Sequence, residues 1–250
     1  MMSRWFHVWI LSAVLVAVCG SASAAQKDTA AKAKPKGAAN PAMAKIEDRP
    51  GLPRVLLIGD SISIGYTLPV RELLRDKANV HRIPTNGGPT IHGLANLNTW
   101  LGDSKWDVIH FNWGLHDLKY IGPDKENLAD PELPTSHPQV PLADYEQNLR
   151  DLVSQLKATG AALIWCDTTP VPQGAAGRVA GDEVKYNTAA ARVMKDAAIP
   201  TNDLHAHATL KLRDIQLPAN VHFSDSGSKY LAEKVAAAIE SQLPKCQTVP

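Results

Sequence analysis

Residues that could take part in catalysis occur at four places in the sequence. Ser61 ends the tripeptide Gly59-Asp60-Ser61, which follows a short apolar run, and His222 lies far downstream, just before the last predicted helix. A serine hydroxyl is a poor nucleophile until a neighbouring imidazole accepts its proton. Ser61 and His222 therefore form the candidate pair. The two remaining groups follow the second and third predicted strands, and they are Asn86-Gly87-Gly88 and residues 112–117.

An alternation of short apolar runs with helical patterns predicts how these groups are positioned. Continuous apolar runs are typical of parallel strands that are buried on both faces. Such strands alternating with amphipathic helices predict a three-layer α/β/α sandwich around a central parallel sheet. Ligands bind beyond the carboxyl ends of the strands of such a sheet, so the four groups should meet at one edge. The predicted strands are residues 54–58, 80–83, 107–111, 161–166 and, more weakly, 199–204, and helical spacing is clearest around residues 70–77, 149–156 and 230–239.

The chain resembles the SGNH (GDSL-like) hydrolase family over residues 54–243. Gly59-Asp60-Ser61 after a first strand is similar to block I of the family, and Val221-His222-Phe223 occupies the place of its C-terminal histidine. The resemblance implies a flavodoxin-like arrangement in which Ser61 is the nucleophile and His222 its general base. It further implies ester hydrolysis through an acyl-serine intermediate, with neither a cofactor nor a metal ion.

The resemblance also implies an oxyanion hole, which holds the negative charge of the tetrahedral intermediate. In the family its donors are the amide of the nucleophile, a block II glycine amide and a block III asparagine side chain. The first two correspond to Ser61 and Gly88, with Gly87 as a near alternative. Where block III usually has asparagine, this chain has His116. Either His116 donates instead or Asn112 does, and Asn112 is slightly favoured because a neutral amide donates at any pH.

The carboxylate that orients the histidine is missing from its usual place. The family has aspartate three residues before the histidine, but this chain has Ala219, followed by the uncharged Asn220. One possibility is that Asp203 or Asp225 fills the role from elsewhere. A second is that a backbone carbonyl orients His222 in a Ser-His dyad, and a third is that the protein is an inactive relative.

The ends of the chain predict export and a tether. Residues 1–24 have a positive start, an apolar run and a small-residue cleavage site, which together are typical of a signal peptide. Residues 25–50 are rich in Ala, Lys and Pro and are predicted to be a disordered tether to a folded domain at residues 51–245. The expected location is periplasmic or secreted. Such a compartment permits a disulfide between Cys166 and Cys246, although two free thiols are equally compatible with the sequence.

Composition and position narrow the expected substrate. A formal net charge of +1 gives no electrostatic footprint for nucleic acid, and no stable membrane insertion is expected after signal cleavage. Asp60 and Trp113 are predicted at the substrate edge, and the proline-rich segment 119–141 is long enough to shape a groove. We expect a small ester or an acylated glycan as substrate, with acetyl as the acyl group. The alternatives are a lipid esterase or thioesterase at the envelope, and a catalytically silent carbohydrate-binding protein.

Overall fold

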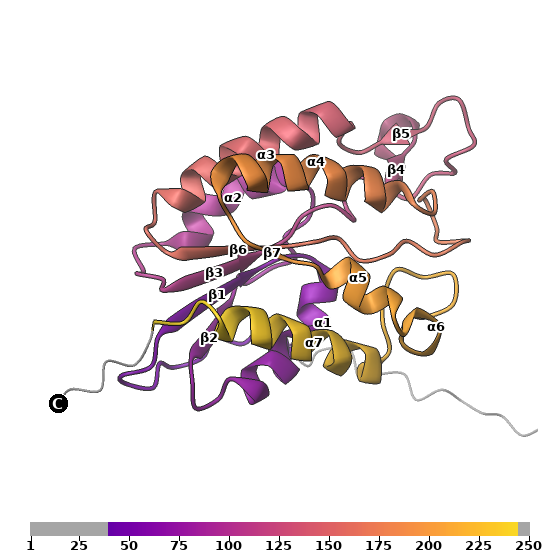
Figure 1. Ribbon diagram of the computed structural model, residues 1–250. Coiled ribbons are helices and arrows are strands. Elements are labelled where there is room, and N and C mark those ends of the chain that lie inside the picture. Colours follow the sequence, from indigo (N-terminus) through magenta and orange to yellow (C-terminus); the bar gives the residue numbers. More distant parts are fainter. Residues whose placement is uncertain (1–39, 245–250) are drawn as a thin grey trace, which may run out of the picture. The chain divides into compact units, whose positions relative to one another are not determined.

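A central sheet of five parallel strands organises the chain in the computed structural model, which describes residues 40–244 (Figure 1). The strand order is β2-β1-β3-β6-β7, and each neighbouring pair is parallel. The predicted strands are thus confirmed in type and to within a few residues in position. Their bounds are β1 Arg54–Ile58, β2 Asn79–Arg82, β3 Val108–Phe111, β6 Ala162–Cys166 and β7 Thr201–Asn202.

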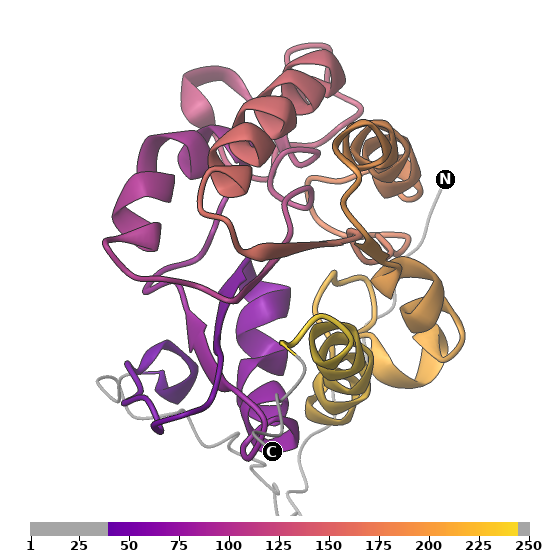
Figure 2. The ribbon, with the colours of Figure 1, turned by 60° about the vertical axis from the view of Figure 1, so that its left-hand side comes forward.

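Helices cover both faces of this sheet, which confirms the predicted three-layer α/β/α architecture (Figures 1 and 2). One face carries α2 (Thr90–Leu101), α3 (Leu142–Lys157) and α4 (Asp182–Ala197). The other face carries α1 (Ser61–Leu73) and α7 (Asp225–Glu240), with the short α5 (Leu204–Thr209) and α6 (Leu212–Ile215) beside them. Helices α2 and α4 were not predicted, because polar and small residues weaken their apolar stripes.

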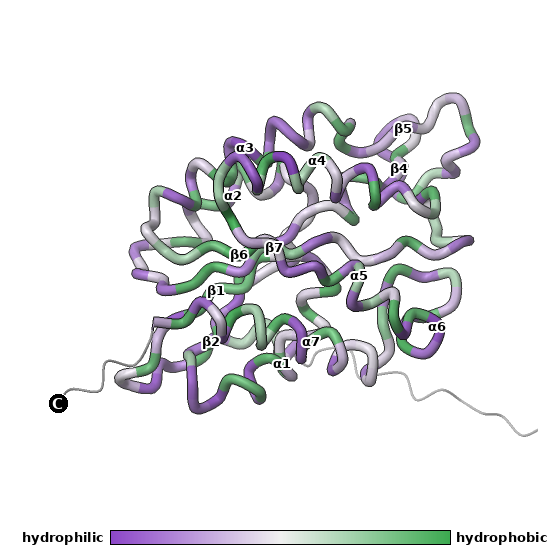
Figure 3. The backbone as a smooth tube through the Cα atoms, viewed as in Figure 1, coloured by the Kyte–Doolittle hydropathy of each residue, from purple (hydrophilic) through white to green (hydrophobic). Residues whose placement is uncertain are grey.

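The hydrophobic core follows directly from this covering of both faces. Val55, Leu57 and Ile58 of β1 have no exposed surface, and Figure 3 shows hydrophobic residues concentrated along the central strands. The exception is His110 of β3, which is fully buried and makes a contact of 3.1 Å between its Nε2 and Asn202 Nδ2. Burial lowers the pKa of His110 to about 3, so this imidazole stays neutral and acts as a core group.

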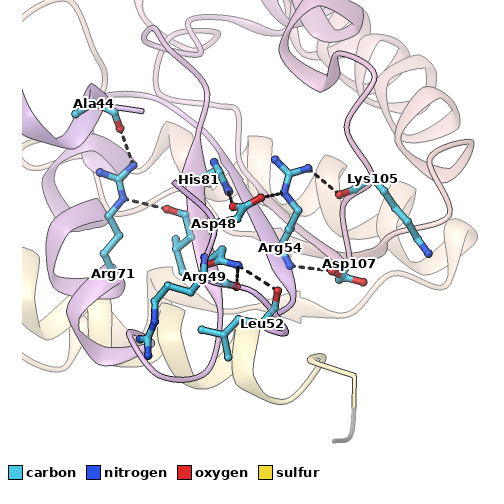
Figure 4. A network of polar contacts seen from close by, with 11 residues as sticks. Ala44, Asp48, Arg49, Leu52, Arg54, Arg71, His81, Lys105 and Asp107 are labelled. Atoms are coloured by element: carbon cyan, nitrogen blue, oxygen red, sulfur yellow. Dashed lines mark hydrogen bonds and ion pairs between the residues drawn. The ribbon is translucent and has the colours of Figure 1, made fainter. Parts of the chain in front are cut away.

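The folded unit begins earlier in the chain than the sequence suggests. The predicted tether runs to residue 50, but residues 40–50 contact the domain through polar groups (Figure 4). Asp48 pairs with Arg54 of β1 and with His81 of β2, while the Arg49 amide donates to Asn79 Oδ1 at 2.8 Å. A segment without apolar periodicity can therefore dock by charge and hydrogen bonding. The signal peptide, the rest of the tether and Cys246 lie outside the described residues.

The proline-rich segment after β3 is ordered and packs on a second loop. It contains β4 (Tyr120–Ile121), a 3-10 turn at Pro123–Lys125 and β5 (His137–Pro138), with β4 and β5 antiparallel. The Tyr120 amide donates to the carbonyl of Gly177 at 2.7 Å. Gly177 lies in the loop that follows β6, so the two longest loops at this end of the sheet are joined.

Candidate active site

Ser61 lies at the carboxyl end of β1, where the chain turns directly into α1. Asp60 caps the helix, because its Oδ1 accepts the Ile62 amide at 2.9 Å. Ser61 is the first helical residue, and its amide has no acceptor in the part of the chain that the structure describes. A free amide at a helix N-terminus is well placed to stabilise negative charge. Asp60 itself is 3% exposed and so does not lie at the substrate edge where it was predicted.

A buried arginine supports the turn that carries Ser61. Nη2 of Arg82 donates to the carbonyls of Gly59 and Asp60, at 2.9 and 3.2 Å, and to the hydroxyl of Ser63. Burial lowers the pKa of Arg82 to about 10, which still leaves it charged at neutral pH. Sequence reasoning missed this residue. The available signal was a charged side chain between Val80 and Ile83, in a strand that was predicted to be buried.

His222 is brought to Ser61 by a tight turn just before α7. The contact between Ser61 Oγ and His222 Nε2 is 2.8 Å. The turn closes through the Leu217 amide, which donates to the carbonyl of His222 at 2.9 Å. Ala219 has a φ of +50°, a conformation that non-glycine residues adopt rarely. The two residues that the resemblance pairs, 161 positions apart in the chain, are thus in hydrogen-bond contact.

The outer nitrogen of His222 contacts an amide rather than a carboxylate. Asn220 Oδ1 lies 2.7 Å from His222 Nδ1 and also accepts the His222 amide at 3.0 Å. With Nδ1–H donating to this oxygen, Nε2 is left free to accept the Ser61 proton. The two candidate acids lie elsewhere. Asp203 caps α5 by accepting the Ala206 amide, Asp225 lies in the first turn of α7, and within residues 40–244 neither hydrogen-bonds His222.

The predicted oxyanion donors differ in whether their N–H groups already have an acceptor in the protein. The Gly88 amide donates to Asn86 Oδ1 at 2.9 Å, and the Gly87 amide donates to the carbonyl of Gly59, also at 2.9 Å. Asn112 donates from Nδ2 to the carbonyl of Cys166 at 2.7 Å and is largely buried. The Asn112 amide therefore ties β3 to β6, contrary to the preference for it as an oxyanion donor. His116 makes no side-chain hydrogen bond within the described residues.

A cleft of about 290 Å³ opens above Ser61 and His222. Burial lowers the pKa of His116, and the nearby Lys119 and Arg178 lower it further against the opposing effect of Asp60. The imidazole of His116 is therefore neutral at pH 7 and can donate one N–H. The residues that line the cleft are Ser61, Asn86, Leu115, His116, Lys119, Asn127, Leu128, Arg178, Val221 and His222.

Trp113 is absent from this cleft, because it belongs to the core. It is 1% exposed, and its indole N–H points to the carbonyl of Gly87 at 3.4 Å. A Cβ on Gly93 of α2 would lie 2.7 Å from Trp113 Cζ2, so the helix packs directly on the ring. The prediction that Trp113 lies at the substrate edge is therefore wrong: the end of β3 lies at the active edge, but the Trp113 side chain points inward.

Comparison with known proteins rests on the fold, since no protein-family model and no curated protein matches the sequence. The chain is similar to the lipase/acylhydrolase from Enterococcus faecalis, with 19% identity and a TM-score of 0.63 over 78% of this chain and 100% of that one. It is similar to Axe2, an acetylxylan esterase from Geobacillus stearothermophilus, with 18% identity and a TM-score of 0.60 over 75% and 94%. A protein from Slackia heliotrinireducens that is grouped with the SGNH hydrolases gives 20% identity and a TM-score of 0.55 over 76% and 100%.

The chain has the SGNH hydrolase fold. The resemblance seen in the sequence is thereby confirmed at the level of the fold. Two further properties can be stated of residues 40–244. They contain no helix that is both long enough and apolar enough to cross a membrane, and they contain no cluster of three or more side chains suited to hold a metal ion.

Asp117, the residue after His116, has a structural role. Asp117 is fully buried, and its Oδ1 accepts both the amide and the hydroxyl of Thr90, at 2.8 and 2.6 Å. Thr90 is the first residue of α2, so Asp117 anchors that helix to the loop after β3. Burial raises the pKa of Asp117 to about 7. This anchor fixes the backbone next to His116 without reaching the cleft.

The amide contact of His222 predicts how Asn220 affects turnover. We expect Asn220→Asp to raise kcat/KM by about tenfold, because a carboxylate keeps the hydrogen bond and adds charge that stabilises the imidazolium. The gain is limited because both side chains are exposed and water screens their charges. We expect Asn220→Ala to lower kcat/KM by about tenfold through loss of the oriented ring.

Steady-state kinetics on an activated ester would measure both changes. Asn98→Asp on the exposed side of α2 adds the same charge away from the cleft and should leave kcat/KM unchanged. An Asn220→Ala variant as fast as the wild type would show that this amide does not orient His222.

Proposed function

We propose that the protein is an exported serine esterase that hydrolyses short acyl esters, with acetyl as the acyl group and carbohydrate as the alcohol. The observation that carries the proposal is the hydrogen-bonded series Ser61 Oγ, His222 Nε2, His222 Nδ1 and Asn220 Oδ1, with contacts of 2.8 and 2.7 Å. A nucleophile that contacts a base, itself oriented by a third group, is the geometric signature of an activated serine.

The reaction would proceed through an acyl-enzyme. Nε2 of His222 accepts the Ser61 proton while Oγ attacks the ester carbonyl carbon. The carbonyl oxygen becomes an oxyanion, which the Ser61 amide and the His116 N–H stabilise. Collapse breaks the bond to the alcohol oxygen, and His222 returns the proton to that leaving group. A water molecule then attacks the acyl-Ser61 carbonyl, with His222 as base again, and releases the carboxylic acid and free Ser61.

Three observations support a short acyl group and an exported site of action. A cleft of about 290 Å³ lies at the lower end of the range for ligand sites and suits a small acyl chain. Two of the structurally similar proteins are described as acetylxylan esterases. The N-terminal sequence pattern favours export. The silent-protein alternative loses support because the nucleophile, the base and an orienting group are all in contact.

A substrate comparison tests this proposal. Purified protein should release acetate from acetylated xylan and hydrolyse 4-nitrophenyl acetate at least tenfold faster, by kcat/KM, than 4-nitrophenyl palmitate. A preference for palmitate would favour the lipid esterase alternative and contradict acetyl specificity. Fractionation of cells that express the full chain should recover the processed protein outside the cytoplasm.

A further inference from the structure

We propose that this cleft is built for an ester that carries an anionic group, a carboxylate above all, bound by Arg178 and Lys119. The inference deepens the proposed esterase function and rests on it. An acylated sugar next to a uronic acid is one substrate of this chemistry. The basis is a pair of cations in the same cleft as Ser61 and His222, with no Asp or Glu among the lining residues.

Neither cation has an acidic partner. Arg178 donates from Nε to the carbonyl of Leu115 at 3.1 Å and from Nη1 to the carbonyl of Ala176 at 3.3 Å, and its Nη2 makes no hydrogen bond within residues 40–244. The ammonium of Lys119 makes none in the same range, and neither residue has an ion pair there. Part of the guanidinium is therefore used to fix the side chain, and the rest remains available to a ligand.

The two positive charges are held partly away from water. Arg178 and Lys119 are each partly buried, and burial lowers the pKa of both. The Arg178 charge also lowers the pKa of Lys119. A desolvated cation without a partner costs free energy. Binding an anion between the two groups would recover that cost, and it would do so only when such a ligand is present.

The two acidic groups that act on these cations through space are hydrogen-bonded elsewhere. Asp60 is buried and caps α1, and Asp117 is buried and bound to Thr90. Asp130 and Glu132 line a separate hollow that Arg178 also borders, but neither lies within ion-pair distance of a cleft cation. Within the Asp130 turn, the carboxylate accepts the Glu132 amide. Asp60 raises the pKa of Arg178 and Asp117 raises that of Lys119 through space, but within residues 40–244 no carboxylate forms an ion pair with either cation. Both cations therefore keep polar hydrogens for a ligand.

Arg178 is also held rigidly in place. The preceding residue, Gly177, has a φ of +59°, and a Cβ added there would lie 2.3 Å from Leu128 Cα. This close approach fixes the loop after β6 against the proline-rich segment that contributes Lys119. A guanidinium fixed in one orientation, with Nη2 free of hydrogen bonds within residues 40–244, loses little entropy when it binds a carboxylate.

Two pairs of esters, each differing in one charge, test the proposal. In the first pair, 4-acetoxybenzoate and the neutral 4-acetoxybenzamide, the charge lies on the alcohol side. In the second pair, 4-nitrophenyl hydrogen succinate and 4-nitrophenyl butyrate, it lies on the acyl side. For each ester, kcat/KM of a variant is divided by that of the wild type, so the intrinsic reactivity of the ester cancels. The pair whose anionic member loses more kcat/KM than its neutral member shows which half of the substrate the cations bind.

We expect Arg178→Gln to lower kcat/KM for the anionic member of one pair by about tenfold, a change of about 1.4 kcal/mol. Lys119→Gln should lower it about threefold to tenfold, and the neutral member should stay within about twofold for both variants. The matched control is Lys105→Gln, an exposed lysine outside the cleft. Equal slowing of both members would mean that the cations act on the developing oxyanion, and wild-type kcat/KM for both members would mean that the cations have no role. Either result overturns the proposal.

A binding measurement separates this inference from the esterase proposal. 4-Acetamidobenzoate cannot be cleaved as an ester, so its affinity is independent of turnover. It should bind the wild type more tightly than 4-acetamidobenzamide does, and added NaCl should reduce the difference. If no ester is hydrolysed while this preference exists and is lost in Arg178→Gln, the esterase proposal fails and the anion site stands. Equal affinity of the two amides would overturn the anion site.

Discussion

Replacing Ser61 by alanine is expected to lower kcat/KM on 4-nitrophenyl acetate by at least about 10⁴-fold, because removal of the nucleophile from a serine hydrolase costs up to about 10⁶ in turnover. Ser63, the nearest other serine in the sequence, cannot take over. The residue is 2% exposed, and its hydroxyl donates to the carbonyl of Asp60 at 2.7 Å. The oxyanion donors would remain, so a small residual rate above the uncatalysed reaction is expected.

Labelling with a fluorophosphonate probe gives a second measurement of the same change. The wild type should label at one serine, Ser61→Ala should not label, and His222→Ala should label much more slowly because no base activates the hydroxyl. Ser154→Ala on the exposed side of α3 is a matched control and should behave as the wild type. Thermal unfolding of each variant would show that the fold is retained. Full labelling of Ser61→Ala would place the reactive serine elsewhere.

The architecture was predictable because strands that are buried on both faces consist mainly of apolar residues. Strands β1 and β6 contain continuous apolar runs, and that of β3 is interrupted only by His110. Such runs are typical of parallel strands that helices cover on both faces. The end of each run also predicted where Ser61 and residues 112–117 would lie, since parallel strands deliver their carboxyl ends to one edge. Strand ends locate backbone positions, however, and they do not determine where each side chain points.

The wrong predictions at the site arise because the position of a residue at a strand end does not determine the direction of its side chain. Asn112 and Trp113 end the same strand, but one side chain ties β3 to β6 and the other packs under α2. Asn220 was set aside because it carries no charge. The turn at Ala219 nevertheless brings its amide oxygen to 2.7 Å from His222 Nδ1. A search for a hydrogen-bond acceptor two residues from the histidine would have found it, whereas a search for an acid could not.

The supporting contacts around the nucleophile depend on tertiary structure alone. Arg82 lies at the end of β2, and no local pattern relates it to the carbonyls of Gly59 and Asp60. The same holds for Arg178, whose place in the cleft depends on how the loops after β3 and β6 pack together. Its Nε donates to the carbonyl of Leu115, which is 63 residues earlier in the chain. Such contacts become visible only once the strand order is known.

His116→Ala is expected to lower kcat/KM by about 10²- to 10³-fold, the loss that follows removal of one oxyanion donor. His116 is the one polar side chain at the block III positions that both lines the cleft with Ser61 and has no hydrogen bond within the described residues. Its environment favours the neutral ring, because burial and the cations Lys119 and Arg178 lower its pKa. A neutral ring donates one N–H without adding a charge that would oppose those cations.

Substitutions at the two positions test whether His116 or Asn112 is the oxyanion donor. His116→Asn places the family's usual donor in the cleft, and we expect kcat/KM within about fivefold of the wild type because an amide N–H can replace the imidazole N–H. Asn112→Ala should instead lower the midpoint of thermal unfolding, since it leaves the buried carbonyl of Cys166 without its donor. If His116→Ala keeps wild-type kcat/KM while Asn112→Ala loses activity without loss of stability, the assignments are reversed. His116 would then be a wall of the cleft, and the oxyanion would depend on Ser61 at the N-terminus of α1.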